Sequence, residues 1–249
     1  MFVTACAPLL LVALLEQAAA FAPPAPAPGP APAPAAEKSV RPDANRRYRE
    51  TEVDEWIKRF ESAGREIFDQ RKAIVAASGA RPGMQVADVG AGTGLLSLLL
   101  ARAVAPTGKV YAIDIIPKFL AHLDREKARQ HVDNVFTRLG DERSVPLPDE
   151  SVDLMFLCDA YHHFEYPRSM NRSMWKALRP GGTLVLIDYR RVPGTTPKSV
   201  LEHVRAGEDV FSAELVAAGF EKLATTAPLP GLKENYLVRF RKPVPAPAK

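Results

Sequence analysis

Residues 86–94 read Val-Ala-Asp-Val-Gly-Ala-Gly-Thr-Gly, an apolar run that passes directly into three closely spaced glycines. The apolar run predicts a buried strand, and the helical spacing of the apolar residues from Thr93 to Val104 predicts a helix after it. Glycines let a ligand approach the backbone closely, and the free N–H groups at a helix N-terminus favour a carboxylate or phosphate. The stretch therefore predicts a cofactor site of a kind that dinucleotide-binding proteins share.

An acidic residue strengthens this prediction. Asp114 closes the next predicted strand and lies twenty positions beyond Gly94. A carboxylate at that place can accept hydrogen bonds from both ribose hydroxyls of an adenosine. The glycine turn and Asp114 together favour an adenosine-containing cofactor.

The remaining sequence alternates between strand and helix patterns. A doubly wound, mostly parallel α/β sheet with helices on both faces is typical of such alternation. A short loop with Pro and Gly, 228–231, joins the last two strands and indicates an antiparallel pair. Helical spacing over 53–78 predicts one or two amphipathic helices before the sheet. The predicted strands are 84–89, 109–114, 134–138, 152–159, 183–189, 220–226 and 235–241, and the later helices are 117–129, 168–178, 199–205 and 212–218.

Charge and cysteine content give no sign of nucleic-acid binding or of a cysteine-based site. The 249-residue chain has a formal net charge of +4, and its Lys and Arg residues are interleaved with Asp and Glu. No nucleic-acid-binding face is therefore indicated. Its two cysteines, Cys6 and Cys158, provide neither a disulfide framework nor a Cys-rich metal site.

The N-terminal sequence differs in composition from the rest. Residues 1–22 contain a short apolar run and an Ala-Ala-Ala site, as a secretory leader does, although no Lys or Arg precedes the run. The run is too short to span a bilayer. The Ala/Pro-rich residues 23–45 predict an extended linker, residues 46–242 the folded domain, and residues 243–249 a flexible tail. The leader indicates an exported or periplasmic protein, with the cytoplasm as the alternative.

Four stretches together resemble the class I, Rossmann-like, S-adenosylmethionine-dependent methyltransferases. VADVGAGTG (86–94) is similar to the first motif of that family and VYAIDI (110–115) to the second. LGDERSVPLPDESVDLMFLCD (139–159) resembles the stretch that enters the fourth strand, and ALRPGGTLVLIDY (177–189) the fifth-strand motif. The resemblance implies a seven-stranded sheet whose last strand is antiparallel, and S-adenosylmethionine as the cofactor.

The resemblance also implies a role for individual residues. Asp88 would lie near the amino group of the cofactor, and Asp159 near its sulfonium. Asp141 would reach the adenine amino group, a role for which Glu142 competes. The residues that the resemblance assigns to the cofactor are Asp88, Gly90, Ala91, Gly92, Gly94, Asp114, Ile115, Asp141 and Asp159.

The loop after the fourth predicted strand is the expected place for the methyl acceptor. It contains Tyr161, His162 and His163, and we predict that one histidine, with Tyr161, orients or deprotonates the acceptor. In the alternative, one histidine caps the next helix and the other lies on the surface. No Cys or His spacing requires a metal, so none is expected, and a site from His162, His163 and distant His203 is the alternative.

The resemblance also implies a class of acceptor. The loop is not Asn-Pro-Pro-Tyr-like, as it is in enzymes that methylate nucleic-acid bases. The overall pattern is closer to small-molecule methyltransferases resembling those of quinone and sterol metabolism, which implies a small-molecule acceptor. Arg65, Phe68 or Arg71 of the 53–78 segment could contact the cofactor or the acceptor, and a helix that only packs on the domain is the alternative. Nothing in the sequence indicates the oligomeric state.

Two other classes of function compete with a methyltransferase. A nicotinamide-dependent oxidoreductase shares the glycine turn, but neither Tyr161 nor Tyr189 is followed by a lysine in the Tyr-x-x-x-Lys spacing. An exported, non-catalytic domain that binds an S-adenosyl ligand is the second alternative, which the leader suggests. The intact glycine turn, Asp88 and Asp114 favour cofactor binding in either case.

Overall fold

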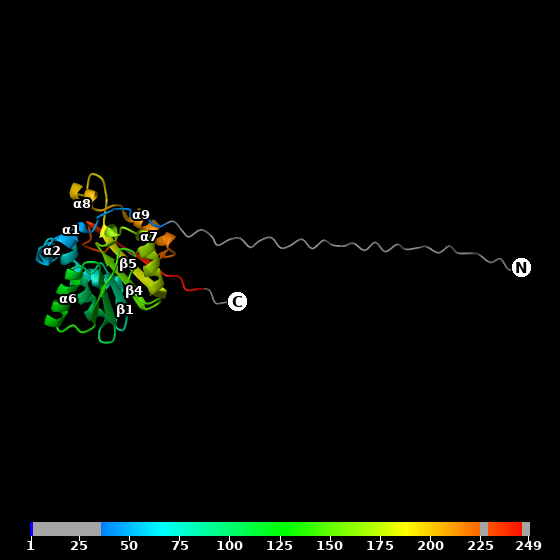
Figure 1. Cartoon of the computed structure of the whole chain (residues 1–249), viewed down its shortest axis with the longest axis horizontal. Coiled ribbons are helices and arrows are strands. Elements are labelled where there is room, and N and C mark those ends of the chain that lie inside the picture. The colour runs from blue at the N-terminus through cyan, green and yellow to red at the C-terminus, as the bar shows by residue number, and fades with distance from the viewer. Residues whose placement is uncertain (2–35, 225–228, 246–249) are drawn as a thin grey trace. The chain divides into compact units, whose positions relative to one another are not determined.

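The computed structural model describes Met1 and residues 36–224 and 229–245 (Figure 1). Residues 2–22 of the predicted leader and residues 23–35 of the predicted linker lie outside the described residues. Among the residues that are described, no helix is both long and apolar enough to cross a membrane.

One seven-stranded sheet organises the domain. Its strand order is β3-β2-β1-β4-β5-β7-β6, and β7 runs antiparallel to both of its neighbours. The predicted fold, a doubly wound and mostly parallel sheet with the last strand antiparallel, is confirmed. The strands are β1 (Gln85–Val89), β2 (Lys109–Asp114), β3 (Val135–Leu139), β4 (Val152–Cys158), β5 (Leu178–Tyr189), β6 (Glu221–Lys222) and β7 (Asn235–Arg241).

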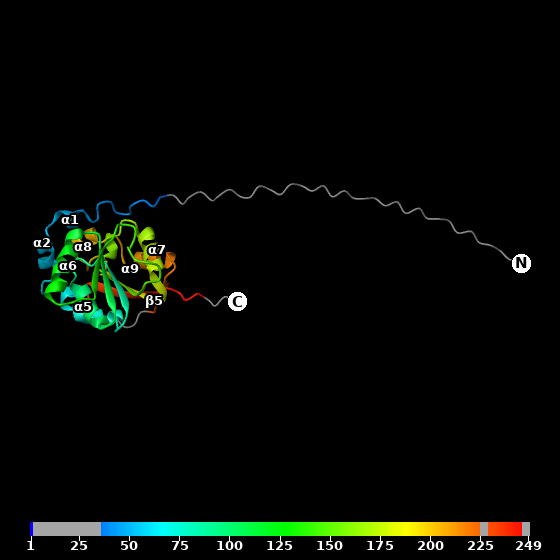
Figure 2. The same ribbon diagram turned by 60° about the horizontal axis from the view of Figure 1, so that its bottom comes forward.

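Helices cover both faces of this sheet (Figure 2). The helices of the domain are α1 (Arg46–Glu50), α2 (Val53–Phe60), α3 (Glu66–Asp69), α4 (Arg71–Ser78), α5 (Leu95–Val104), α6 (Pro117–Arg129), α7 (Pro167–Ala177), α8 (Lys198–His203) and α9 (Glu208–Ala217). A short 3-10 helix, η1 (Tyr161–His163), follows β4.

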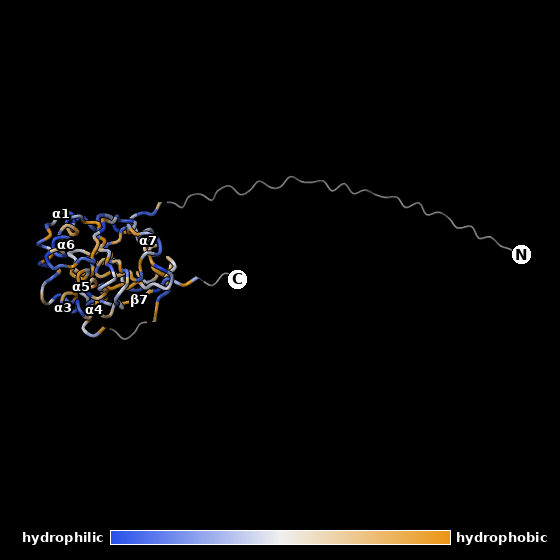
Figure 3. The backbone as a smooth tube through the Cα atoms, turned by 90° about the horizontal axis from the view of Figure 1, so that it is seen from below, coloured by the Kyte–Doolittle hydropathy of each residue, from blue (hydrophilic) through white to orange (hydrophobic). Residues whose placement is uncertain are grey.

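Alternation along β4 explains why the sheet has a hydrophobic cluster on each face. Leu154 and Phe156 join a cluster with residues of α4, α5 and α6, whereas Met155 and Leu157 join a cluster with residues of α7 and α9. Successive side chains of a strand point to opposite faces, and a strand buried on both faces therefore reads as a continuous apolar run. Hydrophilic segments lie mainly along the periphery of the domain (Figure 3).

The segment before the sheet forms several short helices and not one long helix. The predicted helical region 53–78 consists of three pieces, α2, α3 and α4, and Gly64 with φ +90° lies in the first gap. The strand β5 begins at Leu178 rather than at Thr183, because Leu178 already pairs with Val152 of β4. The pairing is irregular between Leu178 and Thr183. These short pieces allow α1 and α2 to lie over the carboxyl end of the sheet, beside α6 (Figures 1 and 2).

The end of the predicted linker packs on the domain. The Glu37 carboxylate accepts hydrogen bonds from the backbone N–H groups of Arg168 and Ser169, at 2.8 Å each. The Val40 N–H donates to the Glu165 carbonyl at 2.9 Å. The compact unit consequently begins at Glu37, nine residues before the predicted domain boundary at residue 46.

Candidate active site at the carboxyl ends of the strands

The glycine turn lies between β1 and α5. Gly90 has φ +79°, and a Cβ atom there would lie 2.5 Å from the Ala160 Cβ, so no side chain fits. The N–H groups of Gly90 and Ala91 both donate to the Ile113 carbonyl, at 2.8 and 3.0 Å. This pairing draws the turn against the end of β2, where Asp114 stands.

Asp114 is buried and held by the backbone. Its Oδ2 accepts the Gly92 N–H at 2.8 Å, and its Oδ1 accepts the Ile116 N–H at 2.9 Å. Burial raises the pKa of this carboxyl to about 6, and the backbone donors counteract the shift. Each carboxylate oxygen has two lone pairs, so both oxygens can still accept a donor from the pocket they line.

Asp88 lies on the other side of the turn. Its Oδ2 accepts a hydrogen bond from the Ser97 hydroxyl at 2.5 Å, and burial raises the pKa of the carboxyl to about 7. This contact ties the end of β1 to the first turn of α5.

Two adjoining pockets open around this turn. The first is lined by Gly90, Gly92, Asp114, Ile115, Asp141 and Asp159. The second is lined by Asp88, Gly90, Ala91, Gly92 and Asp159. Eight of the nine residues assigned to the cofactor therefore line these pockets. The ninth, Gly94, lines neither pocket of the described residues and serves as the N-cap of α5.

Asp141 and Glu142 are the two candidates for the adenine amino group, and both carboxylates already have partners within the protein. Asp141 accepts the N–H groups of Arg143 and Ser144, at 2.6 and 2.8 Å. Glu142 pairs with Arg49 at 2.7 Å. Both residues line the first pocket, so their assignment to the adenine remains a prediction.

Asp159 stands where the two pockets meet, at the end of β4. Its carboxylate pairs with the Arg65 guanidinium at 2.6 Å and accepts a hydrogen bond from Asn235 Nδ2 at 2.6 Å. Burial raises the pKa of Asp159, and the Arg65 charge opposes that shift. Of the three side chains expected to reach the site from residues 53–78, Arg65 lines the second pocket, while Arg71 lies over the Phe68 ring.

An aromatic wall closes the first pocket. Tyr48 and Phe60 line both pockets, and Phe119 of α6 lines the first. The Tyr48 ring stacks on Trp56 with centroids 4.3 Å apart. Sequence reasoning did not single out Tyr48 or Phe119 as site residues. Aromatic residues at helical spacing also form ordinary packing faces, so the sequence carried no signal that would separate the two roles.

His162 is a buried residue of η1. Its Nδ1 lies 2.8 Å from Asp188 Oδ1, and its backbone N–H donates to Asp188 Oδ2 at 3.2 Å. Burial lowers the pKa of His162 to about 3. A neutral imidazole that binds protons this weakly can orient a partner, but it is a poor general base at neutral pH.

His163 and His203 complete a histidine cluster beside His162. His163 lines the first pocket, and its Nε2 lies 3.0 Å from the Tyr48 hydroxyl. His203 ends α8 and lines the second pocket together with His162. Its Nε2 lies 3.2 Å from His162 Nε2.

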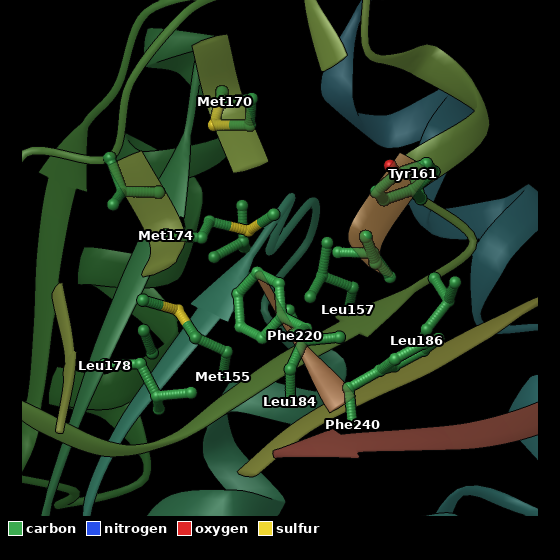
Figure 4. Packing of buried hydrophobic residues seen from close by; sticks show 14 of the residues in the cluster. Met155, Leu157, Tyr161, Met170, Met174, Leu178, Leu184, Leu186, Phe220 and Phe240 are labelled. Atoms are coloured by element: carbon green, nitrogen blue, oxygen red, sulfur yellow. The ribbon is translucent and has the colours of Figure 1, made fainter. Parts of the chain in front are cut away.

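Tyr161 occupies a different environment from the histidines. Its ring is fully buried in the cluster shown in Figure 4, and it lines neither pocket of the described residues. The hydroxyl donates to Glu214 at 3.0 Å and accepts a hydrogen bond from Asn171 at 2.7 Å. These contacts are those of a side chain packed in the core, and they give no support to a catalytic role for Tyr161. That role remains a prediction.

The comparisons with known proteins agree with this geometry. A family model described as a methyltransferase domain matches residues 87–186. A ubiquinone/menaquinone biosynthesis C-methyltransferase, UbiE, of Vibrio parahaemolyticus is 30% identical over 159 residues, which cover 63% of this chain and 58% of that relative. The chain thus spans little more than half the length of this relative.

A solved structure matches a larger share of the chain. The crystal structure of a SAM-dependent methyltransferase from Aquifex aeolicus has a TM-score of 0.67 and 25% identity, and the match covers 78% of this chain and all of that chain. Residues 87–186 thus match a methyltransferase domain, and the described residues have the fold of the class I S-adenosylmethionine-dependent methyltransferases, as the four motifs predict.

Proposed function

We propose that this protein binds S-adenosylmethionine and transfers its methyl group to a small aromatic acceptor. The observation that carries the proposal is the joint lining of the first pocket by the glycine turn and the oriented carboxylate of Asp114. The match of residues 87–186 to a methyltransferase domain supports the same reaction.

The pocket residues fit this cofactor. The close approach of Gly90 to Ala160 leaves room for backbone contact but none for a side chain. Asp114 would accept the ribose hydroxyls, and Ile115 would lie against the adenine. When bound, the cofactor supplies a methyl group that its sulfonium makes electrophilic. The chain then has mainly to align the acceptor and exclude water.

The aromatic wall supports an aromatic acceptor. Tyr48 and Phe60 line both pockets, so a ring bound there would pack against their faces. The relative from Vibrio is named for ubiquinone and menaquinone synthesis, which accords with a hydroxylated ring as the acceptor. In this proposal the neutral histidines orient the acceptor, and the proton that the acceptor loses on methylation is released to water.

Labelled methyl transfer tests the proposal directly. The protein is incubated with deuterated-methyl cofactor and a mixture of phenols, hydroquinones and non-aromatic alcohols, and the products are analysed by mass spectrometry. We expect labelled products from the hydroxylated aromatics alone. Binding of S-adenosylhomocysteine without any labelled product would support the non-catalytic domain. Binding of NAD without the S-adenosyl ligand would support an oxidoreductase.

Asp114→Ala is expected to weaken S-adenosylhomocysteine binding about tenfold or more. The variant removes the acceptor for two buried hydroxyl donors, and unpaired donors cost about 1–3 kcal/mol. Calorimetry measures the dissociation constant. Asp149→Ala, an exposed carboxylate that lines neither pocket of the described residues, is the control. An unchanged constant in a folded Asp114 variant would place the ribose elsewhere.

We also propose that the protein is exported. The apolar run and Ala18-Ala19-Ala20 support this, and we expect residues 1 to about 20 to be absent from mature protein in the native cell. N-terminal sequencing of protein from separated cell fractions measures this. An intact N-terminus on cytoplasmic protein would contradict export.

A further inference from the structure

We propose that His162, His163 and His203 form a binding site for one divalent transition-metal ion, with Zn²⁺ as the ion that fits them. One ring nitrogen from each of the three lies within 4.8 Å of those of the others. The expectation of no metal rested on spacing in the sequence. The fold brings His203 to the His162-His163 pair across forty-one positions of chain.

The separation of two nitrogens matches a tetrahedral ion. Two nitrogens bound to one zinc ion at about 2.0–2.1 Å lie about 3.3 Å apart. His162 Nε2 and His203 Nε2 are 3.2 Å apart. The competing explanation is a single hydrogen bond between these two rings. In that explanation His163 is held separately, by the Tyr48 hydroxyl at 3.0 Å from its Nε2.

The hydrogen bond between Asp188 and His162 leaves the other ring nitrogen of His162 free to bind an ion. The Asp188 carboxylate, fully buried, holds His162 Nδ1 at 2.8 Å. If Nδ1 carries the proton, His162 Nε2 presents its lone pair toward His203. Metal-bound histidines commonly donate their other ring N–H to a carboxylate in this manner. The Tyr48 hydroxyl lies 3.0 Å from His163 Nε2, so an ion would bind His163 through the nitrogen that this contact leaves free.

Groups of both kinds of charge lie beside the cluster. The Asp188 carboxyl contacts His162 Nδ1 at 2.8 Å, and the Arg41 guanidinium donates to the His203 carbonyl. Imidazole binds a metal ion through a ring nitrogen that carries no proton.

The location gives the ion a role in the proposed reaction. His163 lines the first pocket, and His162 and His203 line the second. A three-histidine zinc site keeps an open coordination position, and an ion there can polarise an oxygen atom of a bound molecule. This role rests on the proposed function, whereas the metal site itself does not.

Metal titration without any substrate tests the site. The purified full chain is stripped with a chelator and titrated with ZnCl₂ by calorimetry at pH 7.5, and with CoCl₂ by visible spectroscopy. We expect one ion per chain, and for cobalt the absorption of a tetrahedral, nitrogen-ligated ion. His203→Ala should weaken zinc binding by at least ~100-fold, and Asp188→Asn by ~10–100-fold, as loss of an outer-shell partner does.

Matched variants decide between the explanations. His122→Ala removes an imidazole of α6 outside the cluster and should leave zinc binding unchanged. His203, which is less buried than His162, can be replaced with less risk to the fold, and circular dichroism checks the variants. No zinc binding by the wild-type chain, or equal binding by His203→Ala, would overturn the proposal. The methyl-transfer assay could still succeed in that case, so the two proposals can fail separately.

Discussion

Gly90→Ala is expected to lower the free energy of unfolding by about 2–5 kcal/mol and to abolish measurable S-adenosylhomocysteine binding. A left-handed backbone costs a residue with a side chain about 1–2 kcal/mol. The new Cβ would lie 2.5 Å from the Ala160 Cβ, and such overpacking costs a further ~1–3 kcal/mol. Relief of that contact would push η1 away from the glycine turn. Urea denaturation and calorimetry measure the two effects.

Gly79→Ala is the matched control for Gly90→Ala. Gly79 ends α4 with φ +82°, and a Cβ atom there would meet nothing within 4 Å. This variant carries only the backbone cost of about 1–2 kcal/mol and should bind the ligand normally. Equal destabilisation by both variants would mean that the contact between the turn and Ala160 does not restrict the backbone.

Asp159→Ala is expected to lower the free energy of unfolding by about 3–5 kcal/mol. Its partner Arg65 would keep a largely buried guanidinium without its carboxylate, and such a broken pair is costly. Asn235 Nδ2 would lose its acceptor as well. Chemical denaturation measures the loss, and the double variant with Arg65→Ala should recover part of it.

An exposed ion pair of the same length provides the control for Asp159→Ala. Arg129 and Glu126 also lie 2.6 Å apart, but the Arg129 side chain is 69% exposed, against 21% for Arg65. Glu126→Ala should therefore cost less than ~1 kcal/mol. Similar losses for both variants would show that burial does not set the strength of the Arg65–Asp159 pair.

Local patterns predicted most of the fold. The apolar runs gave the strands, and their alternation with helices gave a doubly wound sheet, because each element must bury an apolar face. Boundaries were less accurate where pairing overrides local preference. Arg179–Gly182 reads as a turn in the sequence, but it interrupts a strand that begins at Leu178.

The cofactor side of the site was also predictable, since its residues follow the strand ends directly. Asp88, Gly90 and Asp114 lie within or just beyond β1 and β2, and adjacent parallel strands bring their carboxyl ends to one edge. Tyr48 and Phe119 were missed, because they reach the pocket through packing between helices far apart in the sequence.

The sequence alone determined the class of fold, the glycine turn and the acidic residue that faces it, because these depend on neighbouring residues. Only the tertiary structure decided which residues of the loop after β4 belong to the core and which line the pockets. It buried Tyr161 in the core, set His162 against Asp188, and brought His203 beside it. Residues 161–163 are consecutive, so their environments differ only because their side chains point in different directions. The packing of the elements around η1 sets those directions.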